Sequence, residues 1–311
     1  MRKSIVVLAV AAMLVTAWSC KGADSGNDDF DIKESGNEVT LIHYYGQGGD
    51  VTIPDNVTSI GEYAFHEKSD LTSVIIPESV TSIGKWAFSN CTSLTSINLP
   101  SSVTTIGDFA FSGSALTSVV IPKNVTTWGE GVFGNCEALT SVTISEGVTT
   151  IGKQAFAACM SLKNVSIPNS VKSIEHSAFS VTALTSVVIP QSVTTIEDYA
   201  FSDCEALASV TISDGVKNIG RSAFSGCISL ASITIPKSIE SIGALAFGEC
   251  KALTKVTYDG TKAKWKELLV SEYGEHGEQH IFVTGTQGTE VICSDGSINY
   301  ASTGLEIEEE S

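Results

Sequence analysis

Six of the eight cysteines recur at one position of a repeated pattern, so thiol chemistry is the first chemistry to weigh. They stand three residues after a phenylalanine: Cys91, Cys136, Cys159, Cys204, Cys227 and Cys250. Disulfides and zinc ligation both use cysteine, but no Cys-x-x-Cys pair is present to favour zinc. Cys91 has no cysteine one repeat away in either direction, so bridging cannot be the general purpose of this position. We expect buried free thiols, with one or two bridges as the alternative.

The five histidines share no repeat position and form no catalytic pattern. His276 and His280, with Glu275 and Glu278, have the spacing of a metal site on one helical face. Gly274 and Gly277 favour a solvated loop instead. Motifs for a nucleophile elbow, a phosphate-binding glycine loop or paired carboxylates are absent from the sequence. We therefore expect no enzymatic activity, no metal site and no cofactor.

Residues 1–19 read as an export signal. Arg2 and Lys3 precede an apolar run that is too short to be a permanent membrane span, and small residues follow it. The formal net charge of −17 argues against nucleic acid as a partner, because phosphate binding uses clustered lysine and arginine.

The end of the export signal suggests a membrane anchor. Cys20 follows Ala17-Trp18-Ser19, which resembles the lipobox of bacterial lipoproteins, although Ala17 and Trp18 are not the usual residues there. The resemblance implies that Cys20 carries lipid; the alternative is a plain secretory signal with an incidental cysteine. Residues 20–37 are polar and glycine-rich, which predicts a flexible tether.

A repeat of 22 or 23 residues organises the middle of the chain. Nine Ala-Phe or Val-Phe pairs end at Phe65, Phe88, Phe111, Phe133, Phe156, Phe179, Phe201, Phe224 and Phe247. Apolar residues alternate within each unit as in a half-buried strand, and all seven prolines directly follow such a strand, where they stop it. One coil alone leaves its apolar side chains open above and below, so the coils must stack. The sequence predicts a mostly β solenoid of about nine 22–23-residue coils.

The flanks of the repeats predict caps over the open ends of this core. Residues 39–53 look like a hairpin leading into the first coil, and residues 261–270 look like a short amphipathic helix. Strands are expected around residues 281–283 and 290–293. The predicted organisation is residues 38–60 for an amino-terminal cap with the first half-coil, 61–257 for the solenoid, 258–300 for a small α+β carboxy-terminal cap and 301–311 for an acidic tail.

Most coils carry a glycine after the second isoleucine, but two carry Glu175 and Glu197 there. A glutamate would be strained at a positive φ. We therefore expect that glycine is preferred for room or turn shape.

Two surfaces are candidates for ligand binding. The first is the outer strand face, whose small uncharged side chains would dock a protein or merely stabilise an exposed sheet. It comprises Ser96, Asn98, Ser118, Val120, Ser141, Thr143, Ser186, Val188, Ser209, Thr211, Ser232 and Thr234. The second is the aromatic column of Tyr63, Trp86 and Phe109 in three successive coils, with Tyr199 later. Exposed, it would stack on sugars or anchor a protein partner; mutual packing or cover by the cap is the alternative.

The coil A-F-x-x-C-x-x-L-x-S-V-x-I-P-x-x-V-x-x-I-G, clearest over residues 87–153, resembles the bacterial leucine-rich repeat of BspA-like surface proteins. The resemblance covers about residues 39–300. It implies a curved leucine-rich-repeat-like solenoid on the outer surface of a Bacteroides-type cell, and with lipid on Cys20 we expect the protein to be anchored to the outer membrane. The expected function is non-enzymatic adhesion or recognition of host or bacterial surface proteins. The alternative is a glycan-binding component of a surface polysaccharide-capture system.

Overall fold

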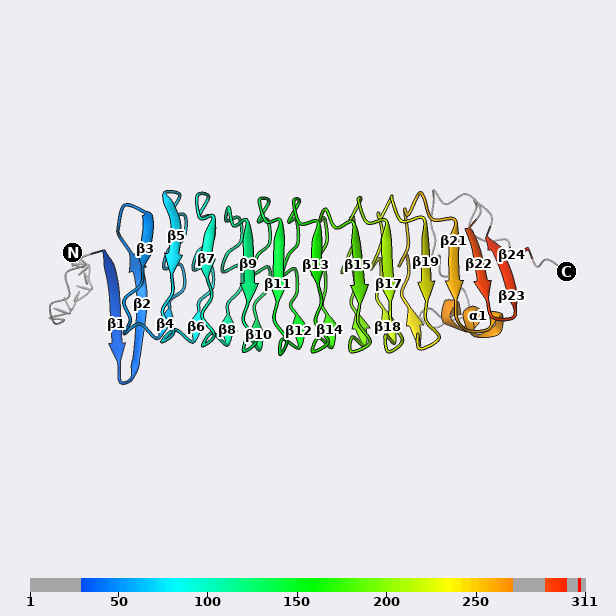
Figure 1. Cartoon of the computed structure of the whole chain (residues 1–311), viewed down its shortest axis with the longest axis horizontal. Helices are drawn as coiled ribbons and strands as arrows, with labels where there is room; N and C mark the ends of the chain where they lie inside the picture. Colours follow the sequence, from blue (N-terminus) through cyan, green and yellow to red (C-terminus); the bar gives the residue numbers. More distant parts are fainter. Residues whose placement is uncertain (1–28, 271–288, 301–306, 309–311) are drawn as a thin grey trace, which may run out of the picture.

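Each repeat forms one coil, and the coils stack into a single elongated solenoid (Figure 1). The computed structural model describes residues 29–270, 289–300 and 307–308. The predicted strand is present in each coil, and in most coils its side chains alternate between exposed and buried, as in Ser141 to Ile144. The long strands are β3 (Gly49–Thr52), β5 (Leu71–Ile75), β7 (Ser96–Asn98), β9 (Ser118–Ile121), β11 (Ser141–Ile144), β13 (Asn164–Ser166), β15 (Ser186–Ile189), β17 (Ser209–Ile212), β19 (Ser232–Ile235) and β21 (Lys255–Tyr258).

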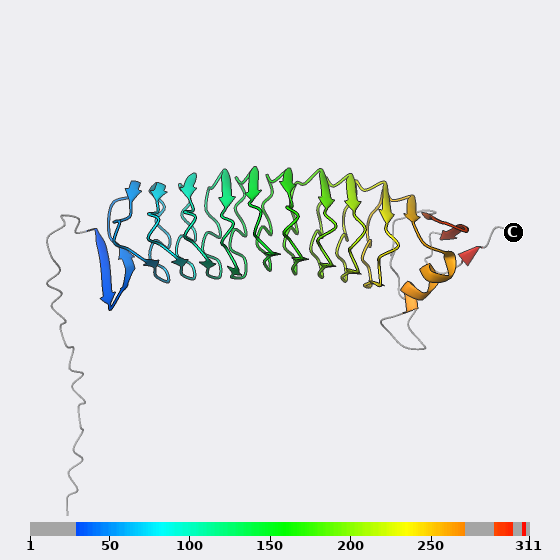
Figure 2. The same ribbon diagram turned by 60° about the horizontal axis from the view of Figure 1, so that its bottom comes forward.

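A second strand of two residues lies on the opposite side of each coil (Figure 2). The sequence had indicated only an apolar step here, such as Val103 and Ile106. In the structure, Ile106 pairs in parallel with Ile83, and its equivalents do the same in neighbouring coils. The short strands are β4 (Ser59–Ile60), β6 (Ser82–Ile83), β8 (Thr105–Ile106), β10 (Thr127–Trp128), β12 (Thr150–Ile151), β14 (Ser173–Ile174), β16 (Thr195–Ile196), β18 (Asn218–Ile219) and β20 (Ser241–Ile242).

Ten aromatic rings stack along the axis of the solenoid. The nine repeat phenylalanines are fully buried, and Tyr44 adds a tenth ring before Phe65. Centroids of neighbouring rings lie 4.8–5.6 Å apart, and the phenylalanine planes are within 13° of parallel. Such offset stacks add to the free energy that each ring gains by leaving water. The predicted continuous hydrophobic column is therefore confirmed.

The sheets on the two sides are interrupted although the core is not. The long-strand sheet breaks between β7 and β9 and between β13 and β15. Both breaks fall at 22-residue coils, whose turn is one residue shorter and carries Ser114 or Thr182 in place of cysteine. The short-strand sheet breaks between β10 and β12, where Trp128 replaces the usual isoleucine. The ring stack continues across every break, so the core holds the coils in line.

The amino-terminal cap differs from the prediction. Strand β1 (Phe30–Ser35) pairs antiparallel with β2 (Glu38–Tyr44). Strand β2 in turn pairs in parallel with β4, so both strands extend the short-strand sheet. The predicted hairpin over residues 39–53 is therefore wrong, because β2 and β3 belong to different sheets. The predicted tether through residue 37 is also wrong in its last part. The side chains of Phe30 and Ile32, two residues apart in β1, both pack against the core. The free energy gained by their partial burial stabilises the strand although the residues around them are polar.

The carboxy-terminal cap contains the predicted helix, α1 (Lys262–Val270). The expected strand near residue 290 is β22 (Thr289–Cys293), and it is followed by β23 (Gly296–Tyr300) and β24 (Ile307–Glu308). Trp265 is fully buried, with its ring centroid 5.3 Å from that of Tyr258, and closes this end of the core. Residues 281–283 and most of the acidic tail lie outside the described residues.

The repeated glycine is selected for room, as the sequence suggested. Among the described residues, no glycine at this position has a positive φ. A Cβ added at Gly84 would lie 2.7 Å from the backbone nitrogen of Glu62 in the preceding coil. Where glutamate replaces it, the backbone nitrogen of Lys153 donates to Glu175 Oε2 at 3.1 Å. The carboxylate thus compensates for the crowding with a hydrogen bond between coils.

Candidate binding surfaces

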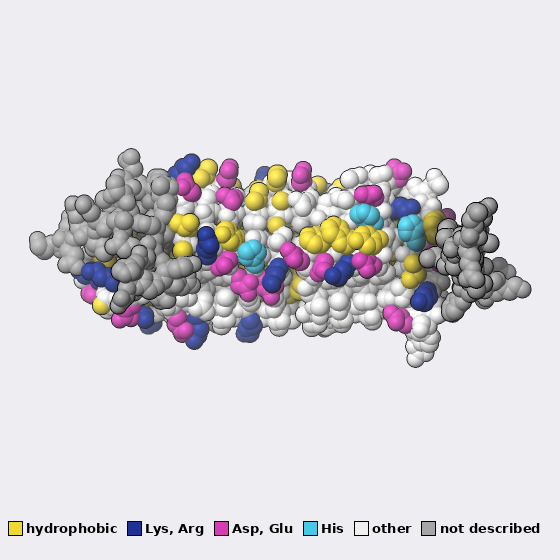
Figure 3. All heavy atoms as spheres, turned by 180° about the vertical axis from the view of Figure 1, so that it is seen from behind, with side chains coloured by type: hydrophobic (Ala, Val, Ile, Leu, Met, Phe, Trp, Pro, Cys, Tyr) yellow, Lys and Arg dark blue, Asp and Glu magenta, His cyan; other side chains and the backbone are white. Residues whose placement is uncertain are grey.

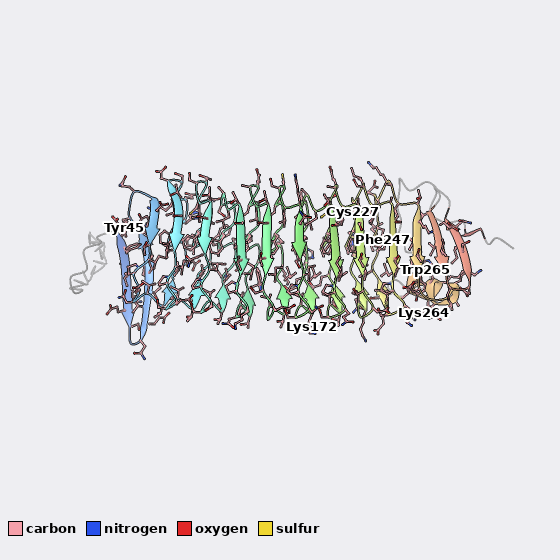
Figure 4. All side chains as sticks on the ribbon, viewed as in Figure 1. Tyr45, Lys172, Cys227, Phe247, Lys264 and Trp265 are labelled. Carbon is pink, nitrogen blue, oxygen red and sulfur yellow. The ribbon has the colours of Figure 1, made fainter. Side chains whose placement is uncertain are left out.

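The repeated cysteines are buried free thiols, as predicted. Each Sγ donates a hydrogen bond of 3.1–3.3 Å to the carbonyl of the phenylalanine in the preceding coil. Figure 4 places Cys227 and Phe247 within the body of the solenoid. Burial raises the pKa of Cys91 to about 12 and the pKa values of Cys136 and Cys204 to about 11. These thiols therefore remain neutral near pH 7 and satisfy backbone groups rather than react.

In the two shorter coils, hydroxyl groups take the place of the thiol. Thr182 Oγ1 donates to the carbonyl of Phe179 at 3.0 Å and lies 3.1 Å from Cys204 Sγ. Ser114 Oγ lies 3.3 Å from Cys136 Sγ. Cysteine is therefore one of several small hydrogen-bonding side chains used at this position, and the first coil carries Lys68 there instead.

The histidines of the described residues are dispersed, and each contacts its own neighbours. His66 Nδ1 lies 2.5 Å from Ser89 Oγ, and Ser89 is fully buried. His43 contacts Tyr45, with ring centroids 4.6 Å apart. Over residues 29–270, 289–300 and 307–308, no group of three or more His, Cys, Asp or Glu side chains is placed to hold a metal ion. The segment with His276 and His280 lies outside the described residues.

The outer strand face is exposed along the whole array. All twelve residues assigned to it from the sequence lie in the long strands with exposed side chains. Most are hydroxyl-bearing, and the two valines, Val120 and Val188, are 58% and 60% exposed. Parallel pairing places these positions side by side in neighbouring coils, as for Thr143 with Val120. From β5 to β19 the face is therefore a long wall without charged side chains, with Asp50 of β3 and Lys255 of β21 at its two ends, and the apolar side chains behind it belong to the core.

The aromatic column occupies a position with positive φ in every coil. Tyr63, Trp86 and Phe109 have φ values of 60°, 56° and 54°. Trp86 and Phe109 are half-buried and stack at 4.4 Å, so the predicted mutual packing holds for this pair. Tyr63 is 46% exposed and instead meets His66 edge-on at 5.3 Å, without cover from the cap. Tyr199 stands apart, against His176.

A column of charged side chains borders the aromatic column. Lys85 Nζ lies 2.6 Å from Asp108 Oδ2 in the next coil. The hydrogen bond between them raises the pKa of Lys85 and lowers the pKa of Asp108. Both groups are solvated, so we regard the pair as aligning neighbouring coils rather than as a large source of stability.

Comparison with known proteins identifies the repeat. A family model described as "BspA type Leucine rich repeat region" matches residues 44–160 and 172–268, with six copies. The chain belongs to the BspA-type leucine-rich repeat family. None of the curated proteins compared with it gives a significant match.

Solved structures similar to this BspA-type chain include other bacterial leucine-rich repeat proteins. A leucine-rich repeat protein of T. pallidum (TpLRR) is 23% identical, with 82% of this chain and 98% of that chain covered, and has a TM-score of 0.52. A leucine rich cell surface protein from Faecalibacterium prausnitzii A2-165 is 26% identical, with 78% and 97% covered, and has a TM-score of 0.48. The similarity to TpLRR supports the solenoid fold alone.

Proposed function

We propose that this BspA-type protein is a non-enzymatic cell-surface lipoprotein that mediates adhesion or protein–protein recognition through the outer strand face. The observation that carries the proposal is the continuous exposure of small, uncharged side chains along that face. A broad flat wall suits a protein surface, because docking there leaves few charged groups to desolvate. The partners would be host or bacterial surface proteins.

Charge placed on the outer strand face tests the proposal. In Val120→Lys/Val188→Lys, we expect adhesion of beads coated with the mature chain to host cells, other bacteria or matrix proteins to fall about tenfold, because a docked partner would bury the new charges. The matched control is Thr149→Lys/Thr194→Lys, at the position beside the short strands where Lys172 and Lys217 occur naturally. Equal adhesion by the two variants would count against recognition through this face.

The lipid anchor is a separate part of the proposal. Cys20 lies outside the described residues, and within the described chain no helix has the length and hydropathy of a membrane span. We expect metabolic labelling with a fatty-acid probe to mark the wild-type protein, and globomycin to block its maturation. Labelling that persists in a Cys20→Ala variant would contradict lipidation at this residue.

Glycan binding within a surface polysaccharide-capture system is the second candidate, favoured by the exposure of Tyr63. A ring with an open face can stack on a sugar. The stacking of Trp86 on Phe109 leaves less open ring surface than three separate aromatics would offer. A glycan array probed with the wild type and with Tyr63→Ala/Trp86→Ala/Phe109→Ala separates the two candidates, because protein recognition through the strand face predicts no sugar signal that this variant removes.

A further inference from the structure

Aromatic side chains gather on one surface near the amino-terminal end of the solenoid. The amino-terminal aromatic patch comprises Tyr63, His66, Trp86 and Phe109, and Tyr45 lies at the same end of the solenoid (Figure 4). Tyr45 is 60% exposed and Tyr63 is 46% exposed, whereas Trp86 and Phe109 are half-buried. Figure 3 shows a hydrophobic band on this face with histidines beside it toward the amino-terminal end.

The patch is continuous across several coils. The backbone nitrogen of Tyr63 donates to the carbonyl of Lys85 at 3.0 Å, and that of Trp86 donates to the carbonyl of Asp108 at 2.9 Å. These bonds hold the aromatic positions of three coils in one column. The imidazole of His66 then extends the surface sideways from Tyr63. The side chains therefore present one platform on a rigid scaffold.

The charge around the patch is strongly negative. Residues 29–112 contain eleven acidic and three basic residues, a net charge of −8, whereas residues 201–270 contain seven acidic and eight basic residues, a net charge of +1. Glu62 is exposed beside Tyr63, and the side chain of Glu67 beside His66 is 70% exposed.

Two of the three cations in this region already have internal partners. Lys85 binds Asp108, and Lys68 Nζ lies 5.7 Å from the ring centroid of Tyr44. The local field therefore attracts positive groups, and the Lys68 contact provides an example of a cation held over an aromatic ring at this end of the solenoid.

We propose that the amino-terminal aromatic patch binds a lysine- or arginine-rich segment of a partner protein. This inference rests on the proposed recognition function and adds the charge of the partner. A cationic head would lie over Tyr63 and near Glu62 and Glu67, while its aliphatic stem packs on the edges of Trp86 and Phe109. The acidic surroundings repel an anionic glycan, and they attract a cationic segment more strongly than a neutral glycan, which carries no net charge.

Binding of fluorescein-labelled nonaarginine to the mature chain, measured by fluorescence anisotropy at physiological ionic strength, tests the proposal. We expect Tyr63→Ser/Trp86→Ser to weaken binding about tenfold, because it removes the ring that lies under a cationic head and one of the rings that its stem packs against. Serine occurs naturally at this position in Ser177 and Ser222, so the coil tolerates it. Tyr199→Ser, at the same position outside the patch, is the matched control and is expected to retain the wild-type affinity.

A second pair of variants separates local charge from net charge. Glu62→Gln/Glu67→Gln should weaken binding more than Glu137→Gln/Glu205→Gln, which removes the same charge from exposed positions of later coils. Wild-type affinity in Tyr63→Ser/Trp86→Ser, confirmed as folded by circular dichroism, would overturn the proposal. So would binding of neutral glycans that is lost in this variant while nonaarginine still binds.

The two proposals can fail separately. Adhesion that depends on the outer strand face, combined with nonaarginine binding that ignores the patch, would remove the inference about cations and leave the recognition function. Unchanged adhesion in Val120→Lys/Val188→Lys, combined with patch-dependent nonaarginine binding, would remove recognition through the outer strand face and leave the binding of cations by the patch.

Discussion

Replacing Phe156 with alanine is expected to destabilise the solenoid by about 3–5 kcal/mol, the range for a buried phenylalanine reduced to alanine. Phe156 is fully buried, and its ring centroid lies 5.6 Å from that of Phe133 and 5.4 Å from that of Phe179. The substitution opens a cavity and removes both stacking contacts. Neither neighbour can close the gap, because each ring is held by its own coil.

Urea denaturation followed by circular dichroism and tryptophan fluorescence measures this effect. Trp128 meets Phe156 edge-on, with ring centroids 6.1 Å apart, so its emission reports on the damaged region. The half-buried column residue Tyr199, changed to serine, should shift the free energy of unfolding by no more than about 0.5 kcal/mol. A loss below about 1 kcal/mol for Phe156→Ala would mean that the stack is not a main source of stability.

The six repeated cysteines are expected to resist alkylation in the folded chain. A rise in pKa from 9.0 to about 11 lowers the thiolate fraction of Cys136 and Cys204 roughly a hundredfold at neutral pH, and burial also blocks the reagent. Iodoacetamide should therefore leave these cysteines unmodified in the native mature chain and modify all six in guanidinium chloride. Mass spectrometry of tryptic peptides reads both states. Rapid native labelling at any of the six would contradict the burial of that thiol.

The same pKa shifts predict a loss of stability at alkaline pH. An unfolded thiol ionises near its ordinary pKa of 9.0, whereas folded Cys136 and Cys204 keep their protons to about pH 11 and Cys91 to about pH 12. The unfolded state therefore binds fewer protons above pH 9, and the free energy of unfolding falls as pH rises toward the folded pKa values. Cys136→Ser/Cys204→Ser should flatten this decline, because serine does not titrate in that range. An unchanged slope would assign the decline to other groups.

Much of the fold could be predicted from the sequence because its information is local and is repeated in every coil. The spacing of Phe, Leu, Val and Ile determines the period, the long strand and the inward face. The recurrence of cysteine after the phenylalanine indicated a structural role, and its hydrogen bond to the phenylalanine carbonyl confirms this. The helix of the carboxy-terminal cap was predictable for the same reason, since its core-facing residues, Trp265 and Leu268, lie three apart in a single short segment.

Features that depend on contacts between particular coils emerged only in three dimensions. Phe30 and Ile32 lie in a polar segment, and this segment forms a strand because the two side chains pack against the core at the start of the solenoid. The sheet breaks depend on how the shorter turn of a 22-residue coil, or the side chain of Trp128, packs against the adjacent coil. The aromatic column looked uniform in sequence, yet Trp86 stacks on Phe109 whereas Tyr63 turns to His66 and stays exposed. A repeat specifies what every coil does alike, but the exposure of one side chain depends on the residues packed above, below and beside it.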